Sequence, residues 1–135
     1  MRPGTRAGNN SKKVSCLPGP PSGSLAGAGM SHVPALRHLT VGIIGAGNMG
    51  QAILAGLRRA GVPSARLYVA EVRAATASAV QRRFRARIVS VPTLARQCDA
   101  IILAVKPQDL GLVVALLRGS LGTQARRTLV ISIAA

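Results

Sequence analysis

The sequence has almost no aromatic residues: its 135 positions include one tyrosine, one phenylalanine and no tryptophan. Proteins that hold nucleic acid often stack bases on aromatic side chains, so this scarcity argues against a nucleic-acid partner in spite of a net charge of +15. The hydrophobic fraction of 48% therefore comes mainly from Ala, Val, Ile and Leu. Such aliphatic residues suit a parallel β-sheet that is covered by helices.

Long apolar runs and cysteines are also scarce. No stretch of about 20 apolar residues occurs, so we expect no transmembrane helix and no membrane partner. Cys16 and Cys98 are too few and too far apart for a disulfide framework or a metal site, and we expect both to be reduced and structurally incidental. A cluster of arginines at residues 82–87 falls near an expected helix end, where a solvated basic surface is favourable.

Residues 1–36 differ in composition from the rest of the chain. Gly, Pro and Ser dominate there, and no acidic residue and no apolar periodicity occur. Such a segment cannot bury enough surface to offset the entropy lost on ordering, so we expect a disordered leader. It lacks the apolar core of a secretory signal, and its prolines and glycines oppose the amphipathic helix of a mitochondrial presequence. We therefore expect a cytoplasmic location, with a mitochondrial one as the alternative, and Met30 as an alternative start.

Residues 39–135 alternate between short apolar runs and helical patterns, which predicts one dinucleotide-binding domain of α/β class. Strands are expected at residues 39–44, 66–70, 86–90, 100–105 and 128–133, and helices at residues 48–59, 74–83 and 107–117, with a short helical turn after Pro92 and a break at residues 119–122. Helical crossovers between strands imply a parallel sheet. The expected fold is a doubly wound, Rossmann-like sheet of about five strands in the order 3-2-1-4-5.

Three glycines follow the first expected strand at the spacing G-x-G-x-x-G. Gly45 allows the tight turn out of the strand, where a Cβ would clash. Gly47 lets the backbone lie against a pyrophosphate, and Gly50 allows close packing of helix on strand. An ordinary strand–helix turn is the alternative, but the periodicities on both sides favour a dinucleotide-binding turn.

The helix after this turn has a regular apolar pattern. Met49, Ile53 and Leu57 recur at i, i+4 and i+8, with Ala52 and Gly56 beside them, and we expect these residues to form its buried face. The free N–H groups at the helix start, with the positive end of the helix dipole behind them, favour phosphate groups.

Two residues after the second expected strand bear on the choice of cofactor. Glu71 lies 21 positions after Gly50, close to the spacing of about 20 for an acid that binds an adenosine ribose, and this favours NAD. Arg73 can bind a 2′-phosphate through two hydrogen bonds, and the surrounding basic charge favours the same ligand. We expect NADPH as the cofactor, with NADH as the alternative.

Three segments closely resemble pyrroline-5-carboxylate reductase: GIIGAGNMGQAILAGL (residues 42–57), ILAVKPQ (102–108) and VISIAA (130–135). The first segment alone would also suit oxidoreductases of the 6-phosphogluconate-dehydrogenase-like group. The other two segments favour pyrroline-5-carboxylate reductase over that group. The resemblance covers residues 39–135, the N-terminal dinucleotide-binding domain of the reductase family. The resemblance implies hydride transfer from a nicotinamide to the C=N carbon of 1-pyrroline-5-carboxylate, which gives L-proline.

The resemblance also implies roles for two turns. Residues Ala46, Gly47, Asn48 and Met49 would lie on the pyrophosphate, and Ala104, Val105, Lys106 and Pro107 would border the ribose and nicotinamide. The sequence departs from the family at residues 90–93, where SVPT replaces an asparagine near the adenosine ribose.

The family's second, all-helical domain makes the dimer and supplies much of the substrate pocket, whereas this sequence stops at Ala135. We therefore expect the cofactor-binding half of a homo-oligomeric reductase, inactive alone, with no catalytic or metal-binding residue of its own. A stand-alone nucleotide-binding module is the alternative.

Overall fold

The computed structural model describes residues 34–122 and 127–134, so the predictions for the leader and for Cys16 lie almost wholly outside the described residues. Five parallel strands form one sheet in the order β3-β2-β1-β4-β5. The strands are β1 (Val41–Ile44), β2 (Leu67–Ala70), β3 (Arg87–Ile88), β4 (Ala100–Leu103) and β5 (Leu129–Ser132). Both the expected fold class and the expected strand order are confirmed.

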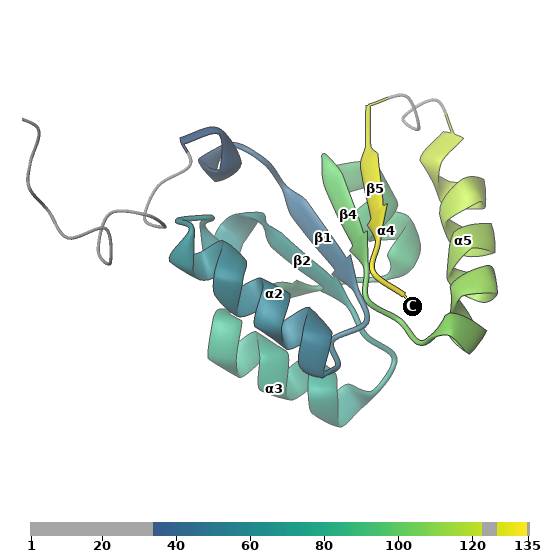
Figure 1. Cartoon of the computed structure of the whole chain (residues 1–135), viewed down its shortest axis with the longest axis horizontal. Coiled ribbons are helices and arrows are strands. Elements are labelled where there is room, and N and C mark those ends of the chain that lie inside the picture. Colours follow the sequence, from purple (N-terminus) through teal and green to yellow (C-terminus); the bar gives the residue numbers. More distant parts are fainter. Residues whose placement is uncertain (1–33, 123–126, 135) are drawn as a thin grey trace, which may run out of the picture.

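Helices cover both faces of the sheet (Figure 1). The first face carries α2 (Asn48–Arg59) and α3 (Ala74–Phe84), and the other carries α4 (Val91–Gln97) and α5 (Pro107–Leu121). Two short 3-10 helices, η1 (Pro34–Arg37) and η2 (Ser64–Arg66), precede β1 and β2. The chain therefore changes face between β3 and β4, and the helices that follow β1 and β4 run on opposite sides of the sheet.

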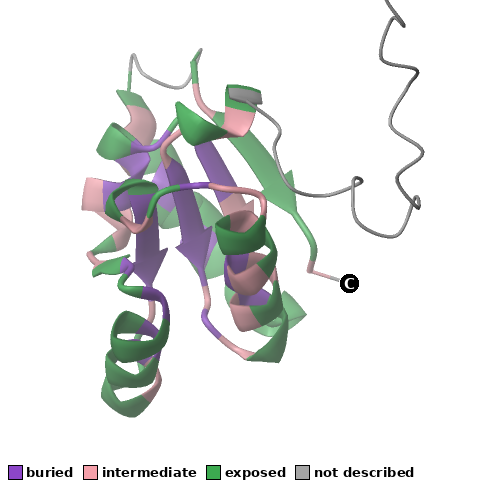
Figure 2. Cartoon of the chain, turned by 90° about the vertical axis from the view of Figure 1, so that its left-hand side faces the viewer, coloured by how far each residue is buried: buried purple, intermediate pink, exposed green. Residues whose placement is uncertain are grey.

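The aliphatic core consists of two clusters, one on each face of the sheet. Because side chains alternate along a strand, Ile43 and Val69 pack toward α2 and α3, whereas Ile44 and Ile101 pack toward α4 and α5. Figure 2 shows the central strands as buried. The expectation of an Ala/Val/Ile/Leu core under helices is confirmed.

The predicted buried face of α2 is confirmed only in part, at Ile53 and Leu57. Gly50 and Leu54 are the buried residues of this helix, and Ile53 and Leu57 pack against the core from its sides. Exposed instead are Met49, Ala52 and Gly56. The centre of the buried face lies one position later than predicted, because Gly50, which has no side chain, allows the helix to approach β1 at that point.

The last helix, α5, is longer than expected. It runs to Leu121 instead of ending at residue 117, and Gly119 lies within it. The buried side chain of Leu117 holds its last turns on the sheet, and the Ser120 hydroxyl donates to the Leu116 carbonyl at 2.7 Å. The helix ends only at Gly122, where φ is +45°.

Cys98 is a free, buried core residue, so the expectation that it is structurally incidental was wrong. A Cβ placed on Gly42 of β1 would lie 2.9 Å from its sulfur and 2.5 Å from Leu94 Cδ2. The thiol therefore packs beneath a strand that has no side chain at that point. Burial, reinforced by the neighbouring charge of Asp99, raises the pKa of Cys98 to about 12, which keeps the thiol protonated.

The arginine cluster lies at a helix end, as predicted. Arg82 and Arg83 occupy the last turn of α3, and Arg85 follows with a φ of +54°. Arg87 lies over the ring of Tyr68 at 5.6 Å and donates to its hydroxyl at 3.2 Å. The cluster therefore lies at the β3 edge of the sheet, where Arg87 contacts Tyr68 of the neighbouring strand.

The opposite edge of the sheet is apolar and exposed. Every residue of β5 is exposed, and Leu129 has 60% of its surface accessible (Figure 2). Within the described ranges, no helix has the length and apolar character needed to span a membrane.

Candidate functional site

A cleft of about 770 Å³ opens at the carboxyl ends of the strands. It lies where α2 leaves β1 toward one face of the sheet and α5 leaves β4 toward the other, the place where doubly wound folds bind ligands. Seven of the predicted site residues line it: Gly45, Gly47, Glu71, Arg73, Ala104, Val105 and Lys106. The two turns that the sequence predicted as cofactor-binding, after β1 and after β4, therefore line the same cavity.

The protein itself requires two of the three glycines. Gly45 has a φ of +93°, and a Cβ there would lie 2.6 Å from the carbonyl oxygen of Ala104. Its N–H donates to the Ala70 carbonyl at 2.9 Å. A Cβ on Gly50 would overlap the Gly45 carbonyl, so any side chain there would push α2 away from the strand.

Gly47 differs from the other two glycines because nothing in the protein lies within 4 Å of a Cβ built on it. It lines the cleft and precedes α2, and the structure gives the N–H groups of Asn48 and Met49 no acceptor among the described residues. These free donors, the positive end of the helix dipole and the open space above Gly47 fit a pyrophosphate.

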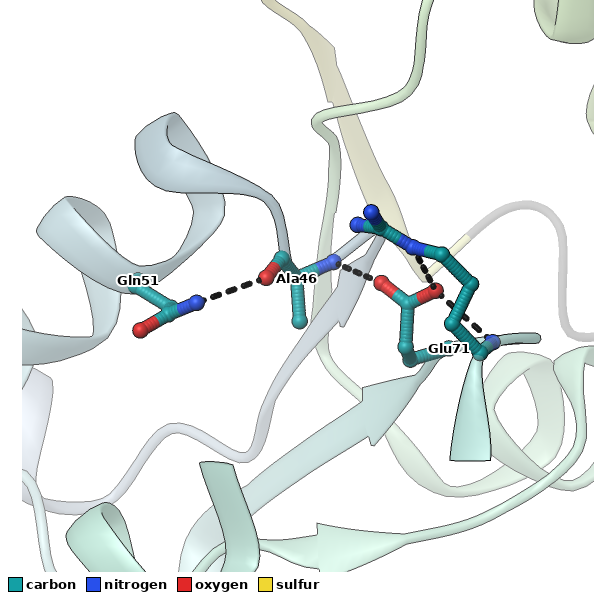
Figure 3. A network of polar contacts seen from close by, with 4 residues as sticks. Ala46, Gln51 and Glu71 are labelled. Atoms are coloured by element: carbon teal, nitrogen blue, oxygen red, sulfur yellow. Dashed lines mark hydrogen bonds and ion pairs between the residues drawn. The ribbon is translucent and has the colours of Figure 1, made fainter. Parts of the chain in front are cut away.

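A hydrogen-bond network joins this turn to the end of β2 (Figure 3). The carboxylate of Glu71 points toward Ala46 and accepts from its N–H at 2.8 Å through Oε2. Its other oxygen, Oε1, accepts from the backbone N–H of Arg73 at 3.0 Å and from Arg73 Nε at 3.3 Å. The Gln51 amide donates to the Ala46 carbonyl at 3.0 Å, so both backbone polar groups of Ala46, which belong to the two peptide units on either side of it, are bonded.

Glu71 is ionised in this setting. Burial by itself raises the pKa of the carboxyl, but the N–H groups of Arg73 and Ala46 and the charge of the Arg73 guanidinium outweigh it. The pKa of Glu71 therefore lies below its ordinary value of 4.5.

The turn after β4 forms the opposite wall. The Ala104 N–H donates to the Ile44 carbonyl at 2.8 Å, which holds this turn beside the first one. Lys106 precedes α5 as its N-cap residue, and Pro107 opens the helix, where its missing N–H costs nothing. Lys106 is exposed and lines the cleft, so its ammonium group is available to an anionic ligand.

Five predicted residues do not line the cleft: Ala46, Asn48, Met49, Gly50 and Pro107. Ala46 and Gly50 are buried and shape the turn from beneath. Asn48 and Met49 are exposed in the first turn of α2, where their N–H groups have no acceptor among the described residues.

Sequence reasoning missed the apolar wall that α5 contributes. Gln108, Leu112 and Leu116 line the cleft at helical spacing, beside the buried stripe of Val113 and Leu117. The sequence did contain a signal for this wall, because α5 has two apolar stripes. A helix that packs on the sheet with one face needs a single apolar stripe, so the second stripe indicates another contact. The cleft is also lined by Val72 and by residues 90–92, where the sequence differs from the pyrroline-5-carboxylate reductase pattern. Ser90 caps α4 there by accepting from the Thr93 N–H at 3.4 Å.

Fold and cleft together define a nicotinamide dinucleotide-binding domain of the oxidoreductase class. Residues 40–135 match the family described as "NADP oxidoreductase coenzyme F420-dependent", and the chain belongs to that family. Among curated proteins, the comparison gave no match.

Several solved structures share the fold, and two of them have a sequence identity above 25%. A pyrroline-5-carboxylate reductase from Coxiella burnetii is 26% identical with a TM-score of 0.66, over 72% of this chain and 36% of its own. The Plasmodium falciparum pyrroline carboxylate reductase, solved with NADP bound, is 27% identical with a TM-score of 0.59, over 78% of this chain and 35% of its own. An imine reductase variant from Myxococcus stipitatus, in complex with NAD+, is 23% identical with a TM-score of 0.60, over 71% of this chain and 32% of its own, and shows the fold alone.

The chain spans about a third of the length of these reductases. The similarity to pyrroline-5-carboxylate reductases therefore concerns their dinucleotide-binding domain, as the sequence resemblance predicted.

Proposed function

We propose that the chain is the cofactor-binding part of a reductase that converts 1-pyrroline-5-carboxylate to L-proline at the expense of NADPH. The observation that carries this proposal is the similarity to two pyrroline-5-carboxylate reductases over the region that contains the glycine turn and the turn after β4. The NADP present in one of them supports NADPH as the cofactor. We further propose a cytoplasmic location and a homo-oligomeric complete protein.

Each part of the cleft has a task in this proposal. The N–H groups of Asn48 and Met49 bind the pyrophosphate, for which the open space above Gly47 leaves room. Arg73 and Lys106 supply positive charge at two places on the rim. The apolar side chains of Leu112 and Leu116 exclude water from one wall. When bound, the nicotinamide supplies a hydride for an imine carbon.

The chain alone is expected to bind NADPH without making proline. Hydride transfer requires the donor and acceptor carbons to be held in near-attack geometry, and a nicotinamide on this domain provides only the donor. The groups that orient the imine carboxylate are proposed to come from residues outside this chain.

Two measurements test the proposal. The first is calorimetric titration of the 135-residue chain with NADPH, with Gly47→Val as the control that should lose binding. The second is a chimera in which residues 40–135 replace the matching domain of the Coxiella burnetii enzyme. The chimera should oxidise NADPH only when 1-pyrroline-5-carboxylate is present, and should form L-proline.

The outcomes separate the alternatives. A chimera that melts cooperatively and binds NADPH but forms no proline would reject the reductase proposal and favour a non-catalytic nucleotide-binding module. A chain that binds neither NADPH nor NADH would reject nucleotide binding itself.

A further inference from the structure

Glu71 lines the cleft, but its carboxylate is turned toward the backbone of this chain. Its side chain is only 4% exposed, whereas that of Arg73 is 65% exposed. Both carboxylate oxygens accept hydrogen bonds from this chain, from Ala46 on one side and from Arg73 on the other. An acid that binds an adenosine ribose must turn free lone pairs toward the ligand, and three of the roughly four acceptor positions of this carboxylate are occupied.

We propose that Glu71 is a positioning residue and not a ribose ligand: it joins the phosphate-binding turn to the loop after β2 and orients the guanidinium of Arg73, which the sequence predicts to bind the 2′-phosphate of NADPH. This inference rests on the proposed binding of a nicotinamide dinucleotide. It names the feature of the site that selects the phosphorylated cofactor.

The geometry of Arg73 supports this role. Only Nε of the guanidinium is bonded to Glu71, and its two terminal nitrogens have no acceptor among the described residues. A guanidinium fixed at Nε keeps the pair of terminal N–H groups that binds a phosphate through two hydrogen bonds. Arg73 is also the residue that precedes α3, so it lies at the positive end of that helix.

The other carboxylate oxygen of Glu71, Oε2, fixes the phosphate-binding turn through the N–H of Ala46. Glu71 bonds the N–H of the peptide before Ala46, and Gln51 bonds the carbonyl of the peptide after it, so neither peptide can rotate without breaking a hydrogen bond. The orientation of Ala46 sets where the next N–H groups of the turn point. One carboxylate therefore fixes the relative position of the pyrophosphate site and the Arg73 guanidinium.

Two ligands without a nicotinamide isolate this feature: 2′-phospho-ADP-ribose and ADP-ribose. Their affinities are measured by calorimetry for the wild-type chain, Arg73→Ala, Glu71→Gln and the double variant. Arg73→Ala should weaken 2′-phospho-ADP-ribose by about tenfold or more and change ADP-ribose by less than about twofold. Glu71→Gln should lower the preference for the phosphorylated ligand by about threefold to fivefold, because the guanidinium is no longer held.

The double variant tests whether Glu71 acts through Arg73. If it does, Glu71→Gln should not change the preference further once Arg73 is alanine. Arg82→Ala, which removes the same charge from the exposed far end of α3, is the matched control and should leave the preference unchanged. Circular dichroism of each variant establishes that it is folded, and Glu71→Asp, which keeps the charge on a shorter side chain, serves if Glu71→Gln does not fold.

Opposite results would overturn the inference. If Glu71 binds the ribose directly, Glu71→Gln will weaken ADP-ribose and strengthen the phosphorylated ligand, since a repelling charge has been removed. Independent, additive effects of the two substitutions on the preference for 2′-phospho-ADP-ribose over ADP-ribose would also show that Glu71 does not act through Arg73. Failure of the wild-type chain to bind either ligand would reject the proposed function and this inference with it, whereas tight binding with reversed selectivity rejects this inference alone.

Discussion

The turn after β1 and the loop after β2, which both line the cleft, are held in place by different means. The turn after β1 is fixed by close backbone packing, because Gly45 and Gly50 each leave no room for a Cβ. The loop after β2 is fixed by one carboxylate, that of Glu71, through three hydrogen bonds. The packing at Gly45 and Gly50 involves no titrating group, whereas the hydrogen bonds of Glu71, one of which reaches Ala46 in the turn after β1, depend on a charge.

The largest effect is expected at Gly50, where close packing fixes the turn after β1. Gly50→Ala places a methyl group on the Gly45 carbonyl, and α2 must move off β1 to relieve the overlap. We expect a loss of about 3 kcal/mol in the free energy of unfolding, measured by urea denaturation. Gly47→Ala is the matched control, since its methyl group meets no atom within 4 Å, and should cost less than about 1 kcal/mol. Equal losses for the two variants would show that close packing does not fix this turn.

A second substitution separates ligand binding from folding in the same turn. Gly47→Val should leave the fold intact, because its backbone is extended, with φ −68° and ψ −167°, and its side chain enters open space. That space is where the pyrophosphate is proposed to lie, so NADPH affinity should fall more than about tenfold, which corresponds to about 1.4 kcal/mol. Calorimetry with NADPH measures this. Unchanged affinity would remove Gly47 from the site.

The difference between the loops also explains what the sequence could predict. The glycine spacing and the apolar runs are local signals, so the strand order, the turn after β1 and the turn after β4 followed from them. The inward direction of Glu71 could not be predicted, because it depends on Ala46 lying opposite in space although 25 positions away in the chain. The spacing rule that assigns such an acid to the ribose describes where it lies and not which way its oxygens turn.

The same limit applies to α2 and α5. Periodicity predicted that both are helices, but the buried side of α2 was set by the contact at Gly50, and the length of α5 by the burial of Leu117. Gly119 is a weak helix former that tertiary packing overrides. The second apolar stripe on α5 becomes meaningful only once the cleft beside it is known.

The smallest expected effect is a dependence of the free energy of unfolding on the protonation of Glu71. Glu71 has a pKa below its ordinary value of 4.5 in the folded chain, so its ionised form stabilises the fold above that value. This contribution is lost as the pH falls through the lowered, folded-state pKa, because protonation then removes the charge that Ala46 and Arg73 bind. Glu71→Gln should therefore be less stable than wild type by about 1 kcal/mol at pH 7, and the difference should shrink toward zero in acid. Urea denaturation of both proteins from pH 7 down to about pH 3 measures the difference. Gly47→Ala should show no such convergence with wild type, since it changes no titrating group. A difference between wild type and Glu71→Gln that stays constant over this range would mean that the loop after β2 is held by packing, as the glycine turn is, and not by the carboxylate charge.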